Sequence, residues 1–248
     1  PQPYFAYVCA HRDRFDGIVF LTEAERKDYL KKYPDASRWS TFAIPHPYPH
    51  PVVPVDFSER DHRKAVIVSR FDPVKRIDYA IDIFKLVTDQ LPDVTLEIYG
   101  FGQETNKYVE QIKKLRLTYN VFVRGFTDDP ASVFRSAAFS MMTSYVEGYP
   151  LTLAESICNG CPVFAFDIKY GPSDVIRDGR TGYLIPFKDH AAFAEKIIAY
   201  FEDEDLQRAF SENAYADAPR FSTDVFLKNW AFFTEAMVRR KTRAPQGV

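Results

Sequence analysis

The sequence predicts an α/β protein built on a doubly wound parallel sheet, and two observations support this class. From residue 63 to about residue 225, short runs that are apolar throughout alternate with amphipathic helical stretches. Strands that are apolar on both faces belong to parallel sheets covered by helices on both sides. The composition, 46% hydrophobic and 27% charged over 248 residues, is that of a globular protein of one or two domains.

A short α/β unit precedes this series. Residues 16–21 form an apolar run that fits a buried strand, Thr22 is a predicted helix N-cap, and a helix follows to about Lys32. Residues 42–44 resemble one more short strand. Because two strands and a helix cannot bury a sheet by themselves, we expect residues 1–50 to be the end of a domain whose preceding strands are missing from this chain.

A proline-rich segment, PHPYPHPVVP at residues 45–54, separates the two regions. Proline fixes φ and removes a backbone donor, so this segment cannot form a helix interior or a central strand. We expect a stiff, extended connector, with a proline-rich ligand for another protein as the alternative. The hinge is placed at residues 51–62, between residues 1–50 and a main domain at 63–225.

Each element of the main domain follows from its pattern. Strands are expected where the apolar run is continuous, and helices where apolar residues recur every three or four positions. The expected strands are residues 65–68, 94–99, 121–123, 139–142, 162–166 and 183–185. The expected helices are residues 76–91, 104–115, 130–136, 151–159, 189–202, 204–213 and 222–241.

Two cations follow the first strand of the main domain. In a doubly wound sheet, ligands bind outside the carboxyl ends of the strands. Arg70 and Lys75 lie at such an end. They suit a diphosphate, because a guanidinium can grip two oxygens and an ammonium acts as a point charge. An ordinary solvated basic loop is the alternative.

Glycines follow the next two strands. Gly100 and Gly102 could let the backbone approach a ligand closely, although a simple tight turn explains such a pair better by itself. Gly125 and Phe126 could place backbone amides and a ring beside a nucleobase, and Phe126 is equally plausible as a core residue. Because the sequence contains neither G-x-G-x-x-G nor a Walker-type GK[ST], dinucleotide cofactors and P-loop hydrolysis lose support.

The most informative feature surrounds the predicted helix at 151–159. Glu147 lies in the loop before this helix, Pro150 suits its first turn, and Glu155 lies about one turn in. First-turn amides lack intrahelical acceptors and can receive a phosphate at the positive helix end. The two carboxylates can therefore border one ligand from either end.

These residues resemble the motifs of a known family. Glu147 and Glu155 match the E-x₇-E signature of retaining glycosyltransferases with the GT-B fold, family 4 in particular, and Arg70 and Lys75 match its SR-x₄-K diphosphate motif. The resemblance implies a Rossmann-like C-terminal half of a GT-B enzyme with a remnant of its N-terminal domain. Further matching segments, which extend the resemblance over nearly the whole chain, are residues 16–23, 44–47, 163–176 and 178–184.

The resemblance implies a role for each site residue. Arg70 and Lys75 would bind the donor diphosphate, the catalytic Glu147 would contact the donor sugar, and Glu155 would bind the ribose. The backbone groups implied to hold the phosphates and the base belong to Gly148, Tyr149, Pro150, Leu151, Gly125 and Phe126.

The implied reaction is transfer of a hexosyl group, with retention, from a UDP-sugar of the glucose or N-acetylglucosamine type. Neither a metal nor another cofactor is expected, because cationic side chains and a helix end neutralise the leaving diphosphate. The acceptor, whether polymer, protein or lipid, is not readable from the sequence. We expect this chain alone to bind the donor but to transfer its sugar poorly.

Two further segments carry expectations. Residues 168–173 read IKYGPS where many family members have a Gly-Gly turn, which resembles the branch that sugars wall teichoic acids or serine-rich surface proteins of Gram-positive bacteria. Residues 226–248 are expected to form a helix that crosses back to the N-terminal domain. Its apolar surface would be partly exposed and prone to association, so a homo-oligomer is a further expectation.

Two other functions remain open. One is a non-catalytic nucleotide-sugar-binding or scaffold subunit of a two-component glycosyltransferase. A non-catalytic subunit would be expected to have lost donor-site residues, and this sequence keeps Arg70, Lys75, Glu147 and Glu155. The other is a sugar-nucleotide epimerase of the same fold, whose catalytic set would lie partly in the missing half.

Charge and hydropathy limit the partners. The net charge of −2 gives no long-range attraction to nucleic acid or anionic lipid. No apolar run reaches the ~20 residues of a membrane span, and the first residues lack the pattern of a signal peptide. A cytoplasmic protein, or one peripheral at the inner face of the membrane, is expected.

Cysteine and histidine spacing predicts no metal site. Three cysteines make no disulfide framework, and the C-x₂-C pair is interpreted as two small buried residues because no second pair completes four ligands. The histidines form no metal-spaced cluster, and those beside the linker prolines suit a hinge. The residues concerned are Cys9, Cys158, Cys161, His11, His46, His50, His62 and His190.

Overall fold

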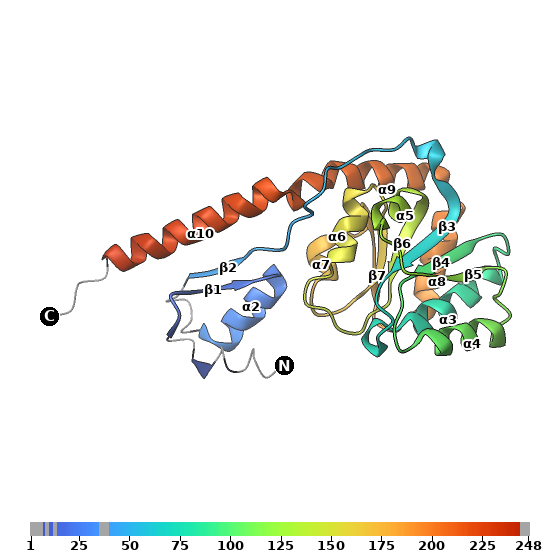
Figure 1. Cartoon of the computed structure of the whole chain (residues 1–248), viewed down its shortest axis with the longest axis horizontal. Coiled ribbons are helices and arrows are strands. Elements are labelled where there is room, and N and C mark those ends of the chain that lie inside the picture. The colour runs from blue at the N-terminus through green and yellow to red at the C-terminus, as the bar shows by residue number, and fades with distance from the viewer. Residues whose placement is uncertain (1–6, 8–9, 12–13, 35–39, 244–248) are drawn as a thin grey trace.

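The computed structural model describes residues 7, 10–11, 14–34 and 40–243, and Figure 1 shows the chain from blue at its N-terminus to red at its C-terminus. The strands are β1 Gly17–Phe20, β2 Ser40–Ala43, β3 Asp61–Val68, β4 Thr95–Tyr99, β5 Val121–Gly125, β6 Ala137–Met142, β7 Val163–Asp167 and β8 Gly182–Pro186. The α-helices are α2 Glu23–Lys32, α3 Ile77–Thr88, α4 Thr105–Lys114, α5 Pro130–Arg135, α6 Leu151–Cys158, α7 Pro172–Val175, α8 His190–Phe201, α9 Glu204–Asp217 and α10 Thr223–Arg243. Short 3₁₀ turns are η3 Phe57–Glu59, η4 Pro73–Lys75 and η5 Ala218–Phe221.

The main domain contains one parallel sheet of six strands, in the order β5-β4-β3-β6-β7-β8. The predicted fold class is therefore confirmed. The chain starts at β3, adds β4 and β5 on one side, and then returns to place β6 on the other side of β3. This reversal of direction is the point at which doubly wound sheets open a crevice for ligands.

The core of the main domain lies on both faces of this sheet. Every residue of β6 is buried, and the rings of Phe139 and Phe164 stack at 4.4 Å on neighbouring strands. Tyr200 of α8 lies over them and donates a 3.0 Å hydrogen bond to the Ala138 carbonyl. Helices α3 and α8 pack together, and α6 packs against α9, so both faces are covered (Figure 1).

The N-terminal unit is small and built as its pattern predicts. β1 and β2 pair in parallel, and α2 packs on them through Tyr29, whose ring contacts Phe20 at 5.1 Å. Thr22 is the N-cap of α2 and accepts a 3.1 Å hydrogen bond from the Glu25 amide, which confirms that prediction. The proline-rich segment that follows contains neither helix nor strand up to Asp56.

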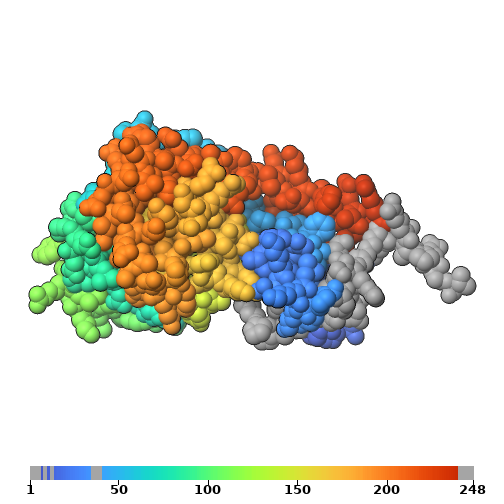
Figure 2. Space-filling model, turned by 180° about the vertical axis from the view of Figure 1, so that it is seen from behind, coloured from blue at the N-terminus to red at the C-terminus, as the bar shows by residue number. Residues whose placement is uncertain are grey.

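α10 connects the main domain with the N-terminal unit. Figure 1 shows this helix leaving the main domain and running along β2. Phe42 of β2 contacts the rings of Phe232 and Phe233 at 5.7 and 5.2 Å. Seen from behind in Figure 2, the red end of α10 lies along the blue N-terminal unit. Leu227 and Val238 are 56% and 62% exposed, so part of the apolar surface stays open to solvent.

α2 also contacts the main domain directly, at the loop that follows β7. Asp28 accepts hydrogen bonds from Lys169 Nζ at 2.7 Å and from the Tyr170 hydroxyl at 3.0 Å. The Glu23 amide, in the first turn of α2, donates a 2.8 Å hydrogen bond to Asp174 of α7. Residues 168–173, which replace the Gly-Gly turn of many family members, therefore include residues that contact the N-terminal unit.

Candidate functional site

Lys75 and Glu147 meet at the switch point of the sheet. Lys75 ends η4 after β3, and Glu147 lies in the loop after β6. The Lys75 ammonium is 2.7 Å from Glu147 Oε1, and the two side chains are only 20% and 11% exposed. The structure thus brings together one cation and one carboxylate that the sequence placed in the same site.

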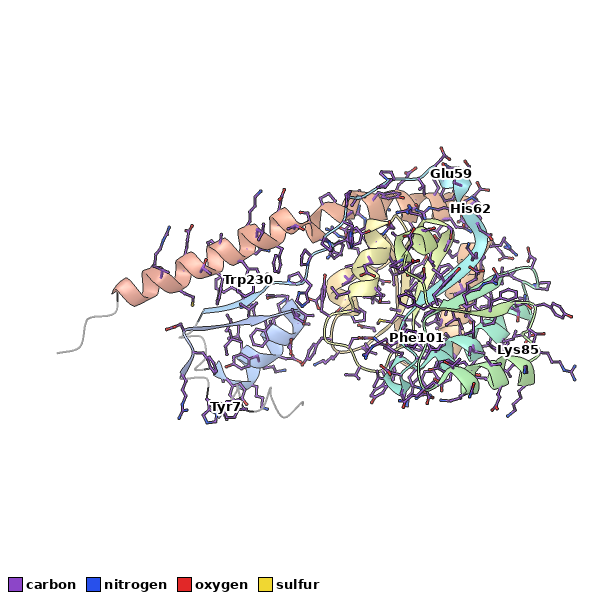
Figure 3. The ribbon with its side chains drawn as sticks, viewed as in Figure 1. Tyr7, Glu59, His62, Lys85, Phe101 and Trp230 are labelled. Atoms are coloured by element: carbon purple, nitrogen blue, oxygen red, sulfur yellow. The ribbon has the colours of Figure 1, made fainter. Side chains whose placement is uncertain are left out.

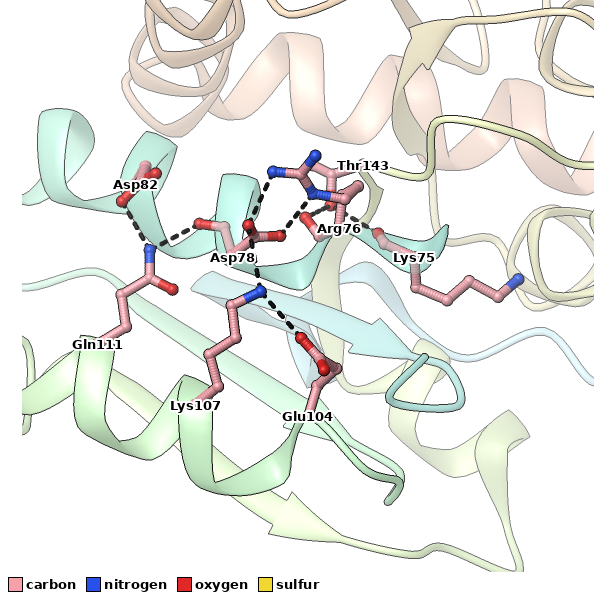
Figure 4. Close-up of polar contacts among 8 residues, drawn as sticks. All are labelled: Lys75, Arg76, Asp78, Asp82, Glu104, Lys107, Gln111 and Thr143. Carbon is pink, nitrogen blue, oxygen red and sulfur yellow. Dashed lines mark hydrogen bonds and ion pairs between the residues drawn. The ribbon is translucent and has the colours of Figure 1, made fainter. Parts of the chain in front are cut away.

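Backbone contacts hold the two loops against each other. The Thr143 hydroxyl donates to the Arg76 carbonyl at 2.8 Å, and the Tyr145 amide donates to the Val74 carbonyl at 3.1 Å. Figure 4 shows Thr143 bonded to this turn, with the Lys75 side chain extending away from the neighbouring Arg76 cluster. The position of Lys75 is therefore set by the β6 loop, which also carries Glu147.

A pocket opens between these two loops and the start of α6. Its volume is about 290 Å³, part of which is open to solvent. The hydroxyls of its wall and the ion pair make it suited to a polar, anionic group. The lining residues are Ile67, Val68, Ser69, Lys75, Ile77, Met141, Met142, Thr143, Ser144, Glu147 and Thr152.

The first turn of α6 borders this pocket through Thr152. Pro150 is the N-cap of α6 and not part of its first turn, so the sequence expectation was one residue off. The amides that follow Pro150 lie at the positive end of a helix of 8 residues, where an anion is favoured. Leu151 is 43% exposed, and no atom lies within 4 Å of a Cβ built on Gly148, so this stretch is open to a ligand.

The loop after β7 supports the Glu147 segment from the side. The Tyr170 amide lies 3.5 Å from the Glu147 carbonyl. A side chain at Gly171 would approach Pro150 Cδ to 2.4 Å and the Gly148 carbonyl oxygen to 3.2 Å, and its φ is +108°. Only glycine fits here, because both the backbone conformation and the space exclude a Cβ.

Arg70 is not brought into contact with this ion pair. Its side chain is 80% exposed, and its guanidinium lies 3.2 Å from Asp72 of the same loop. The resemblance implies that both Arg70 and Lys75 bind the diphosphate, which requires the two cations to lie near one another. Lys75 lies beside Glu147, whereas the role of Arg70 in diphosphate binding stays a prediction.

Glu155 is half-buried on α6, and its side chain has no hydrogen bond within the described part of the chain. Burial raises the pKa of its carboxyl above the ordinary value of 4.5, and the charge of the nearby His50 partly opposes this. Its role as ribose-binding residue stays a prediction. Tyr149 differs, because its side chain packs against the hydrophobic core, so any contact with phosphate would come from its backbone.

An exposed aromatic pair lies after β4 and β5. Phe101 and Phe126 are 66% and 73% exposed, and their rings meet edge to face at 6.0 Å. Figure 3 labels Phe101 on the side of the main domain that faces away from α10. The alternative of Phe126 as a core residue is therefore wrong, and the ring is free to stack on a planar group.

The glycines beside this pair allow close backbone packing. The Gly100 amide donates a 2.7 Å hydrogen bond to the Gly125 carbonyl. A Cβ at Gly100 would lie 1.8 Å from the Ser69 carbonyl oxygen, and one at Gly102 would lie 2.6 Å from the Phe71 carbonyl oxygen. Both glycines thus lie closely against the loop after β3, and a direct contact of Gly100 or Gly102 with ligand stays a prediction.

Several residues of the site were not identified from the sequence alone. Thr143, Ser144 and Thr152 line the pocket, and Asp28 and Tyr170 join the N-terminal unit to the loop beside Glu147. Thr143 and Ser144 could have been identified from the sequence, because polar residues directly after a strand of such a sheet lie at the edge where ligands bind. The other residues have no such signal.

The cysteines and histidines show no metal-binding arrangement in the described ranges. Cys158 and Cys161 are free thiols and buried, as expected, and burial raises the pKa of both. Cys9 lies outside the described residues. No group of three or more His, Cys, Asp or Glu side chains suited to a metal is found among the residues that the structure describes. In the same residues, no helix is both long and apolar enough to cross a bilayer.

Comparison with known proteins identifies relatives of this chain. The family described as "Glycosyl transferases group 1" matches residues 55–217. Over 224 residues the sequence is 33% identical to the poly(glycerol-phosphate) alpha-glucosyltransferase of Bacillus subtilis, covering 90% of this chain and 33% of that protein. It is 32% identical over 228 residues to the poly(ribitol-phosphate) alpha-N-acetylglucosaminyltransferase of Staphylococcus aureus, covering 90% and 45%.

Solved structures of similar proteins superimpose on this chain. A mutant of S. aureus TarM in complex with fondaparinux, alpha-GlcNAc-glycerol and UDP superimposes with a TM-score of 0.82 at 30% identity, covering 92% of this chain and 45% of that one. A GtfA/B complex superimposes with a TM-score of 0.82 at 26% identity, covering 94% and 48%. These relatives confirm the resemblance to GT-B enzymes of Gram-positive bacteria. The chain spans between a third and about half of the length of the relatives named here.

Proposed function

Because this chain belongs to the glycosyl transferases group 1 family, we propose that it is the donor-binding part of a retaining glycosyltransferase that uses a UDP-sugar. The observation that carries the proposal is the pocket between Lys75, Glu147 and the start of α6. It combines a fixed ammonium, a positive helix end and a carboxylate within one small space. This is what a diphosphate attached to a sugar requires.

The chemistry follows from these groups. Cleavage of the bond between the sugar and the diphosphate places negative charge on the leaving group. The Lys75 ammonium and the first-turn amides of α6 would stabilise that charge, because they are already oriented before the reaction. In this account Glu147 exchanges its ion pair with Lys75 for the hydroxyls of the donor sugar. Retention is proposed through attack on the same face, with the diphosphate taking the acceptor proton.

The relatives support the choice of donor. The B. subtilis and S. aureus proteins are named for the transfer of glucose and N-acetylglucosamine, and the TarM complex contains UDP. We propose that the base lies beside Phe101 and Phe126 and that Glu155 binds the ribose. Donors of the UDP-glucose and UDP-N-acetylglucosamine type are the first to test.

A thermal-shift screen tests this proposal. UDP, UDP-glucose and UDP-N-acetylglucosamine are expected to raise the unfolding temperature of this chain, since a ligand stabilises the folded state to which it binds. GDP-mannose and ADP-glucose should have little effect. Hydrolysis and transfer assays on the longer protein would then measure turnover and the anomeric configuration of the product. A chain stabilised by none of the uridine nucleotides would refute the proposal.

A partner subunit is a second proposal, and it rests on the GtfA/B complex. The apolar surface of α10, with Leu227 and Val238 exposed, is the surface most suited to a further protein domain or subunit. Sedimentation of the longer protein, alone and with candidate partners from the same gene neighbourhood, would test this. A monomer that binds none of them would contradict it.

A further inference from the structure

Ser144 has a buried hydroxyl that no group in the described chain satisfies. It follows β6 directly after Thr143 and precedes Glu147 by three positions. The residue is 1% exposed, and it lines the pocket that also holds Lys75. Its Oγ has no hydrogen-bond partner among the described residues.

An unsatisfied buried hydroxyl lowers the stability of a protein, because it has lost its hydrogen bonds to water and gained none. The neighbouring hydroxyls do not share this situation. Thr143 donates to the Arg76 carbonyl at 2.8 Å, and Ser69 donates to the Arg70 carbonyl at 3.1 Å. Ser144 is thus an unused donor in the pocket, whereas the hydroxyls of Thr143 and Ser69 are engaged.

Other unpartnered buried atoms in the described chain do not combine these properties. The hydroxyl of Tyr108, the indole nitrogen of Trp230 and Nε of Arg60 also lack partners, but none of these residues lines the pocket. Figure 3 labels Trp230 on α10, where this helix has left the main domain. Among the unpartnered buried groups of the described residues, the Ser144 hydroxyl is therefore the one that belongs to the pocket.

The ion pair in the same pocket shows how this hydroxyl would come into use. An incoming diphosphate would compete with the Glu147 carboxylate for the Lys75 ammonium, because an anionic oxygen can pair with that ammonium as the carboxylate does. When the carboxylate is displaced, an anionic oxygen replaces it beside Lys75. The Ser144 hydroxyl, which lines the same pocket, then gains an acceptor that the described residues do not offer it.

We propose that Ser144 is a ligand-binding residue of the donor pocket, whose hydroxyl donates a hydrogen bond to a diphosphate oxygen. The inference rests on the proposed function, since it requires a diphosphate in this pocket. Ser144 adds a directed neutral donor to the positive charge of Lys75 and of the α6 amides. No proton is transferred, and no covalent bond changes.

The test is the variant Ser144→Ala, measured by calorimetry with UDP and with a UDP-sugar. Affinity for both should fall roughly 10- to 100-fold, the loss expected for one hydrogen bond to a charged acceptor. The unfolding midpoint should stay the same or rise, because the unsatisfied hydroxyl has been removed. Ser144→Cys, which keeps the volume and has only a weak donor, should show an intermediate loss of affinity.

Ser211→Ala is the matched control. Ser211 is 5% exposed and donates a 2.8 Å hydrogen bond to the Gly160 carbonyl, away from the pocket. Its replacement should lower the unfolding midpoint and leave the affinity for UDP unchanged. Ser144→Ala is thus expected to lower the affinity and not the stability, and Ser211→Ala is expected to lower the stability and not the affinity.

Two results would overturn the inference. One is an affinity for UDP that is equal in Ser144→Ala and in the wild-type chain. The other is a loss that appears with the UDP-sugar but not with UDP, because this would move the contact from the diphosphate to the sugar. Failure of the wild-type chain to bind any uridine nucleotide is a separate result, which refutes the proposed function before any variant is made.

Discussion

The Lys75 ammonium lies 2.7 Å from Glu147 Oε1, and this contact joins the loops after β3 and β6. These are the neighbouring strands at which the sheet order reverses. The pair is mostly shielded from solvent, so it acts at the bottom of a pocket and not on an open surface. Its separation by an anionic ligand is the central step of the account proposed above.

Glu147→Gln should destabilise the fold by about 1–2 kcal/mol, because Lys75 then keeps its charge in a largely buried place without a counterion. The double variant Lys75→Met with Glu147→Leu should recover most of that loss. Chemical denaturation measures both. The exposed pair of Lys85 and Asp89 is the control, and Lys85→Met should change stability by less than about 0.5 kcal/mol. Equal effects at the two pairs would contradict this prediction.

Arg70→Ala should weaken UDP binding by roughly 1.5–3 kcal/mol while leaving the unfolding transition unchanged. Its side chain is 80% exposed and pairs with Asp72 of the same loop, so it can turn toward a bound diphosphate without disturbing the fold. Calorimetry with UDP measures the effect. Arg180→Ala, at an exposed position before β8, is the control and should bind as the wild type does. Unchanged affinity in Arg70→Ala would remove this residue from the site.

The sequence predicted the main elements because their patterns are local. The stripe of α3, from Ile77 to Val87, and the apolar run of β6 need no distant partner to be recognised. The motif residues Lys75 and Glu147 could likewise be placed at the same edge of the sheet, since parallel strands end together.

What the sequence could not predict depends on contacts between distant segments. Ser144 looks like any polar residue after a strand until its burial and its missing partner are seen. The contact of Asp28 with Tyr170 joins residues that are 142 positions apart, and its bond with Lys169 joins residues that are 141 positions apart. The Arg70 side chain points toward Asp72, and the spacing of motif residues along the sequence does not determine such a side-chain conformation.

Glu155→Gln should weaken UDP binding and alter the pH dependence of stability. Burial raises the pKa of Glu155 in the folded state above 4.5, so the folded chain holds this proton more tightly than the unfolded chain. The stability contributed by the group is therefore complete below pH 4.5 and is lost as pH rises through the raised pKa. The Gln variant should lack this loss and be at least as stable at pH 7. A steeper decline of stability above pH 4.5 in the variant would contradict the assignment.

Asp28→Asn and Tyr170→Phe should each loosen the contact between α2 and the loop after β7. The Lys169 ammonium and the Tyr170 hydroxyl lower the pKa of Asp28, so its charge is present at neutral pH. Hydrogen exchange should become roughly two- to fivefold faster in residues 168–174, with β3 and β6 unaffected. Asp89→Asn, at the C-terminal end of α3, is the control. Unchanged exchange in residues 168–174 would show that this contact does not hold the loop.

The most direct test of the account is calorimetry of UDP with the wild-type chain and with Lys75→Met. Lys75 is the one motif cation that the structure places beside Glu147, so its ammonium should supply a large part of the binding energy. The variant is expected to bind UDP more weakly by roughly 1.5–3 kcal/mol, about 10-fold or more in affinity. Binding of UDP to Lys75→Met as tightly as to the wild type would contradict the claim that this pocket holds the diphosphate.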